Sequence, residues 1–248
     1  MGTAGDLELL RVIGEDLAGS AVAAGMAAPV PSCPEWAVRD LLAHVGTVHR
    51  WASTIVGECR TGPSAESSRP PERELVEWYR HGHATLLDTL ASAPIDVPCW
   101  SFLPSPSPLR FWIRRQLHET AVHRVDAGLA NGETVAYEPD LAADGIDELL
   151  VGLLPRPSSR IRQPVERSVV VHATDAARAW MVVVGPGLPT GHEVTTSPAV
   201  PTAECTVRGS ASDLYLLLWN RRDRSGLDIE GDVDVLEAWR TQMRVGWR

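Results

Sequence analysis

Two histidines and one glutamate have the residue types and the spacing of a divalent-metal site. Glu119 and His123 lie four positions apart in a segment with helical character, HETAVH, residues 118–123. Residues four apart share one face of a helix, so both side chains can reach the same point. His44 lies in a second helical segment, three residues from Leu41 and four from Val48, on the inward face that these apolar residues define.

Zinc or another borderline divalent ion is the cofactor that such a set would hold. Two imidazoles and one carboxylate leave a coordination position open for water or a substrate. His118 and His123 point about 140° away from each other around a helix, so they cannot chelate one ion as an i, i+4 pair would. Asp126 follows His123 by one helical turn, and it could accept a hydrogen bond from that imidazole or form a surface ion pair with Arg115 or Arg124. A hydrogen-bonded core histidine remains the alternative to a ligand at each position.

Four helices are predicted in the first half of the chain, and they must position these side chains. Apolar residues recur with a period near 3.6 in four segments, residues 6–24, 36–55, 72–90 and 109–130. Ser32, two residues before Pro34, is the predicted N-terminal signal of the second helix. The segments between the later helices, residues 61–71 and 94–108, are rich in Ser and Pro and are predicted loops. This order indicates an up-and-down four-helix bundle.

The second half has a different pattern, which predicts a small α+β domain. Short β-branched runs occur at SVVVHAT, residues 168–174, AWMVVVG, residues 179–185, and AECTVRG, residues 203–209. A helix is expected after Ser210, which has capping-box spacing to Asp213, and a last strand and helix follow it. The segment PRPSSRIRQP has no periodicity and is a predicted linker. We therefore expect an α+β fold of two domains, residues 1–158 and 159–248.

Composition excludes several classes of function. The 248 residues carry a net charge of −9, and an acidic chain without a basic stripe is a poor candidate for nucleic-acid binding. The sequence contains no lysine, which excludes lysine Schiff-base mechanisms. No apolar stretch approaches the ~20 residues of a membrane span, and no secretory signal is visible, so we expect a cytoplasmic protein. The cysteines are too dispersed for a disulfide framework or a structural zinc module; they are Cys33, Cys59, Cys99 and Cys205.

Three segments resemble the mycothiol-dependent maleylpyruvate isomerase family of actinobacteria. They are VPSCPEWAVRDLLAHVGTVHRWA, then FWIRRQLHETAVHRVDA, and finally GSASDLYLLLWNRR with LDIEGDVDVLEAWR. The resemblance spans nearly the whole chain in the same order. It implies a DinB-like four-helix bundle joined to a small α+β domain related to sterol carrier proteins.

The resemblance also implies roles for individual residues. The zinc ligands of the family fall on His44, Glu119 and His123. A functionally important arginine falls on Arg221, with Arg222 as the alternative. Val125 stands where family members usually have an aromatic residue, and this departure leaves the substrate undetermined.

Mycothiol is the thiol cosubstrate that the resemblance implies, and the second substrate is a small electrophile. We expect the metal to favour the thiolate for addition to that electrophile, as in cis–trans isomerisation of the maleylpyruvate isomerase kind, with Arg221 holding a substrate carboxylate or stabilising an enolate. A mycothiol S-transferase acting on xenobiotics or biosynthetic intermediates is a second possibility. A non-catalytic small-molecule binding protein with a structural metal is a third. A closed structural zinc site normally has four protein ligands, so a fourth ligand such as Cys33 would favour the third.

Overall fold

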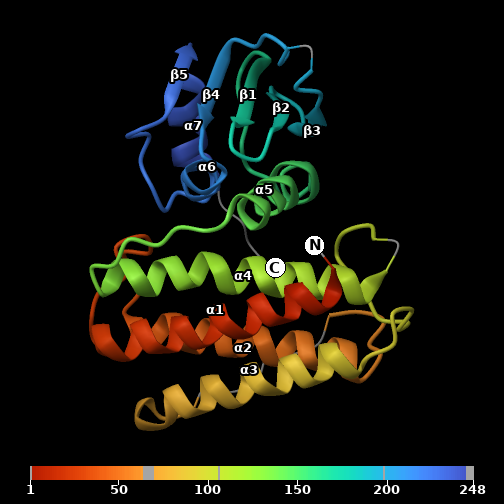
Figure 1. Ribbon diagram of the computed structural model, residues 1–248, viewed down its shortest axis with the longest axis vertical. Helices are drawn as coiled ribbons and strands as arrows, with labels where there is room; N and C mark the ends of the chain where they lie inside the picture. The colour runs from red at the N-terminus through yellow and green to blue at the C-terminus, as the bar shows by residue number, and fades with distance from the viewer. Residues whose placement is uncertain (1, 64–69, 106, 198, 244–248) are drawn as a thin grey trace. The chain divides into compact units, whose positions relative to one another are not determined.

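The chain folds into two compact units, Met1–Val135 and Ala136–Arg248. The computed structural model describes residues 2–63, 70–105, 107–197 and 199–243. The fold class is α+β, as the sequence predicts, with helices in both units and the sheet in the second (Figure 1). In the part of the chain that the structure describes, no helix combines the length and the hydropathy of a membrane span.

The first unit contains the long helices that the sequence predicts, with ends that differ by a few residues (Figure 1). These helices are α1 (Thr3–Ala24), α2 (Val38–Gly57), α3 (Leu75–Ser92) and α4 (Pro108–Ala130). α1 packs on α3 and α4, and α2 also packs on both of these helices. The apolar stripe of each helix meets the others in a core that includes Leu17, Leu41, Leu42 and Tyr79. Burial of these stripes sets how α2 and α4 face each other.

The start of α2 differs from the prediction. The helix begins at Val38, and the carboxylate of Asp40 accepts the N–H of Ala37 at 3.1 Å. Ser32 therefore does not cap this helix. It lies in the Pro29–Ala37 loop, which ends in an isolated β-bridge between its first and last residues. The three prolines of this loop disfavour helix in the residues before them, so α2 does not extend toward the N-terminus through the loop.

The second unit contains a sheet with the strand order β3-β2-β1-β4-β5. The strands are β1 (Arg167–Ala173), β2 (Arg178–Val184), β3 (Thr190–Val194), β4 (Cys205–Gly209) and β5 (Asp228–Gly231). β1 is parallel to β4, and the other neighbouring strands are antiparallel. β3 was not predicted from the sequence because this edge strand is short and polar, with no apolar alternation to mark it.

Helices complete the second unit, and two of them, α6 and α7, line a cavity with valines of the sheet. They are α5 (Pro139–Asp147) with a π-helical turn, η2 (Glu148–Leu153), and then α6 (Ala211–Leu218) and α7 (Asp234–Gln242). Ser210 Oγ accepts the Asp213 N–H at 3.1 Å, as the capping pattern predicts. α5 packs on α6 and η2 packs on β3. Residues 136–158 thus group with the second unit, whereas the sequence analysis divides the chain after residue 158, because their apolar side chains are buried against sheet and helix that come later in the chain.

Candidate metal centre

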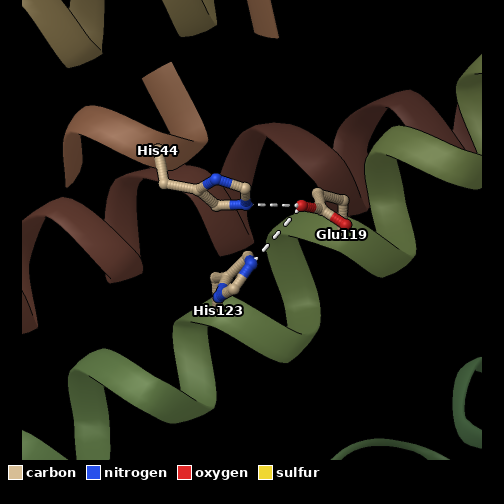
Figure 2. Close-up of side chains that lie close together, drawn as sticks. All are labelled: His44, Glu119 and His123. Carbon is tan, nitrogen blue, oxygen red and sulfur yellow. Dashed lines mark hydrogen bonds and ion pairs between the residues drawn. The ribbon is translucent and has the colours of Figure 1, made fainter. Parts of the chain in front are cut away.

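His44, Glu119 and His123 converge where α2 faces α4 (Figure 2). The carboxylate atom Glu119 Oε1 lies 3.2 Å from His44 Nε2 and 3.3 Å from His123 Nε2. One candidate ligand atom from each residue lies within 4.8 Å of the other two. Ligands about 2.0–2.1 Å from a tetrahedral zinc ion are about 3.3 Å from one another. The donor types and the two distances from Glu119 Oε1 therefore fit such an ion.

Burial differs among the three residues. Glu119 and His123 are 3% and 7% exposed, because α4 is covered on nearly all sides. The His44 side chain is 27% exposed. His44 is therefore the most solvent-exposed of the three residues.

Hydrogen bonds give the two α4 residues opposite charges. Burial acts to raise the pKa of Glu119, but the bonds from His123 and His44 and the charge of Arg115 outweigh it and hold this pKa well below its usual range. Burial acts to lower the pKa of His123, but the bonds to Asp126 and Glu119 raise this pKa to about 9. In the metal-free protein an ionised carboxylate therefore faces a protonated imidazole. A cation at the site would replace the proton on His123 Nε2.

Two buried charged residues form hydrogen bonds to the ligand residues of α4. Asp126, which is 0% exposed, accepts the N–H of His123 Nδ1 at 2.7 Å. Of the two roles that the spacing left open for Asp126, the structure shows the hydrogen bond to the imidazole. Arg115, 2% exposed, donates to Glu119 Oε2 at 3.2 Å. Consequently Nε2 of His123 and Oε1 of Glu119 are the atoms that face the site.

Trp36 forms an aromatic wall beside the two imidazoles. The centroid of its ring lies 5.0 Å from that of His44 and 6.0 Å from that of His123, and it is stacked on the latter. Trp36 is the first residue of the second helix that the sequence predicts, residues 36–55, but the sequence did not identify it as part of the site. Trp36 lies in the loop before α2, so helical periodicity does not predict the direction in which its side chain points.

The other residues considered in the sequence analysis lie outside this cluster. Among the described residues, His118 and Cys33 are not members of the group, and His118 is fully buried. Arg221 belongs to the second unit, where its guanidinium donates to the Trp219 carbonyl at 2.7 Å. Arg222 forms an ion pair with Asp213. Sequence reasoning also missed the role of Arg115, although its i, i+4 spacing to the ligand glutamate was a usable signal.

The fold and the site define a two-domain α+β protein with a candidate metal centre in its helical domain. Residues 7–128 match the family model described as the mycothiol maleylpyruvate isomerase N-terminal domain, and residues 140–238 match the C-terminal domain of the same family. The chain belongs to the mycothiol-dependent maleylpyruvate isomerase family.

Solved structures of one enzyme are similar to this chain over most of its length. The crystal structure of the mycothiol-dependent maleylpyruvate isomerase has a TM-score of 0.63 and 13% sequence identity, and the match covers 92% of this chain and 93% of that one. A histidine-to-alanine mutant of that enzyme has a TM-score of 0.62 with the same identity and coverage. At this identity the likeness concerns the fold. Among curated proteins, none matches the sequence significantly.

Proposed function

We propose that this protein is a zinc- and mycothiol-dependent enzyme that isomerises a cis alkene conjugated to a carbonyl, as in maleylpyruvate. The observation that carries the proposal is the convergence of His44, Glu119 and His123, with each imidazole Nε2 at a distance from Glu119 Oε1 that suits a tetrahedral ion. Family membership supports the thiol and the class of substrate.

The residues of this chain supply three ligand atoms, and a tetrahedral zinc ion would take its fourth ligand from a water or a substrate. A zinc ion bound there would supply a Lewis acid that favours the thiolate form of a coordinated thiol. On zinc binding, His123 would lose the proton on Nε2. It would keep the proton on Nδ1, which is hydrogen-bonded to Asp126. Arg115 balances the charge of Glu119 and occupies its second oxygen. Trp36 limits the directions from which a thiol and a substrate can approach.

The reaction that we propose conserves all atoms of the substrate. The thiolate sulfur adds to one alkene carbon, and the electron pair of the double bond moves toward the conjugated carbonyl as an enolate. The former double bond is then single and rotates. Collapse of the enolate expels the sulfur, which leaves the trans alkene and the free thiolate.

Arg221 is our candidate for holding a substrate carboxylate. A guanidinium binds a carboxylate through two parallel hydrogen bonds, which also fixes the orientation of the substrate. The family resemblance puts this role on Arg221, and Arg222, which forms an ion pair with Asp213, is the alternative. An Arg221→Lys variant should keep the charge but lose the paired geometry, and its KM should rise more than its kcat falls.

Metal content is the first test. Purified wild-type protein should contain about one zinc per chain, and His123→Ala should contain none. His81→Ala is the matched control, because His81 is an exposed histidine of the same unit and its loss should leave the zinc content unchanged. Wild-type protein that is folded but takes up no zinc would refute the metal centre.

The fate of the thiol separates isomerisation from S-transfer. Wild-type protein is incubated with mycothiol and maleylpyruvate, and both the trans product and the free thiol are quantified. Isomerisation predicts a stoichiometric trans product with no loss of thiol. Accumulation of a stable thioether with equal loss of thiol would instead assign an S-transferase.

A further inference from the structure

Backbone hydrogen bonds hold the Pro29–Ala37 loop in its conformation. The Val30 N–H bonds to the Trp36 carbonyl at 3.0 Å, and the Trp36 N–H bonds to the Cys33 carbonyl at 2.8 Å. The Val38 N–H, just beyond the loop, bonds to the Ala28 carbonyl at 2.9 Å and closes its base. These bonds fix the backbone of the loop and so restrict the positions of its side chains.

One side chain of this loop reaches the support of a candidate ligand. Ser32 Oγ donates to Asp126 Oδ1. The other oxygen of the same carboxylate, Oδ2, accepts the N–H of His123 Nδ1 at 2.7 Å. A continuous series of hydrogen bonds therefore runs from Ser32 through Asp126 to His123. Trp36, from the other end of the loop, stacks on the same imidazole.

This series of hydrogen bonds determines the tautomer and the orientation of the His123 imidazole that a metal would bind. An imidazole offers its Nε2 lone pair only when the proton sits on Nδ1 and the ring is turned correctly. A carboxylate at Nδ1 selects that tautomer. A carboxylate held through one oxygen can still rotate, whereas a second bond to the other oxygen fixes its plane.

We propose that Ser32 is a positioning residue for the metal centre, which acts through Asp126 to hold His123 with Nε2 toward the site. This inference rests on the proposed function. The Ser32 hydroxyl has no part in capping α2, which begins six residues later, and it is not needed for the backbone bonds of its own loop. Its hydrogen bond therefore serves the carboxylate behind the ligand.

The test uses the full chain and measures zinc affinity, not turnover. Apparent zinc Kd values are determined by competition with a chromophoric chelator for the wild type, Ser32→Ala and Ser32→Thr. Ser53→Ala is the matched control, because Ser53 lies on α2 and its hydroxyl donates to the His49 carbonyl at 2.8 Å, away from the ligands. Urea unfolding of each metal-free variant measures any loss that is only structural.

Ser32→Ala should bind zinc about tenfold more weakly, at the lower end of the range for outer-shell partners of ligand histidines. Ser32→Thr, which keeps the hydroxyl, and Ser53→Ala should match the wild type. The visible absorption bands of the cobalt(II)-loaded protein should change in Ser32→Ala alone, because they report ligand geometry. The metal-free variants should unfold at similar urea concentrations.

Two results would overturn the inference while leaving the metal centre intact. One is a wild-type Kd and cobalt spectrum in Ser32→Ala. The other is an equal loss of zinc affinity in Ser32→Ala and Ser32→Thr, which would mean that the hydroxyl is not what matters. A wild-type protein that binds no zinc would overturn the proposed function, and this inference with it.

Discussion

Zinc binding should become stronger as the pH rises, because a proton occupies one ligand of the metal-free site. The bonds to Asp126 and Glu119 overcome the effect of burial and raise the pKa of His123 to about 9. Zinc binds the deprotonated nitrogen, so it must displace this proton. Raising the pH removes the competing proton before the metal arrives.

The size of the effect follows from the pKa. Because pH 7 is about 2 units below this pKa, removal of the His123 proton at pH 7 costs about 3 kcal/mol, and the apparent zinc affinity should be ~100-fold weaker than at high pH. Between pH 7 and pH 9 the apparent affinity should rise about tenfold per pH unit, with about one proton released per zinc. The stability of the metal-free protein should move in the opposite direction. The contribution of His123 to this stability is complete below the unfolded pKa of about 6.5 and is lost as the pH rises toward 9.

Chelator competition from pH 6.5 to 8.5, with the chelator calibrated at each pH, gives the slope. Calorimetry in buffers of different ionisation enthalpy counts the protons released. Asp126→Asn removes the carboxylate that accepts from His123 Nδ1, so the pKa of His123 should fall and the slope above pH 7 should flatten. His81→Ala should retain the full slope. An affinity that stays constant or falls between pH 7 and 8.5 would show that no proton is displaced from His123.

Three further outcomes concern the helical unit. Arg115→Met should lower the free energy of unfolding of the metal-free protein by about 3–5 kcal/mol, because it leaves a buried carboxylate without its guanidinium partner; urea unfolding measures this, and an unchanged midpoint would contradict it. Burial, with the nearby charge of His83 as a smaller cause, holds the pKa of His49 well below its usual range, and burial also lowers the pKa of His83. The unfolded chain therefore binds protons that the folded one does not, and stability should fall by up to about 2.7 kcal/mol per pH unit below pH 6.5, as a series of urea curves from pH 7 to 5 can test. Gly14→Ala should destabilise by about 1–3 kcal/mol because its Cβ would lie 2.3 Å from the His83 ring, whereas Gly19→Ala on the same helix meets nothing within 4 Å and should not lower the melting temperature.

Relations within one helix could be predicted from the sequence because the helical repeat determines them. The spacing of Glu119 to His123 places both on one face of α4, and the spacing of His123 to Asp126 allows the hydrogen bond that the structure shows. The long amphipathic helices and the valine-rich strands follow from the same periodicities. These features depend on residues that are close in the chain.

Long-range packing decided the rest of the fold. α5 and η2 belong to the second unit because they pack on α6 and β3, which come later in the sequence. β3 forms an edge strand because β2 offers it backbone hydrogen bonds. None of these three elements has a strong local pattern. The division of the chain and the full sheet could therefore not be predicted from periodicity.

For the candidate site, too, some features follow from the sequence and others from tertiary packing. Residue types and helical spacing determined which side chains of each helix could serve as ligands. The packing of α2 on α4 decided that His44 lies 3.2 Å from Glu119, and the folded Pro29–Ala37 loop decided that Ser32 and Trp36 support the same histidine. No local rule contains these contacts, because they depend on the position of one helix along another and on the path of a loop with three prolines.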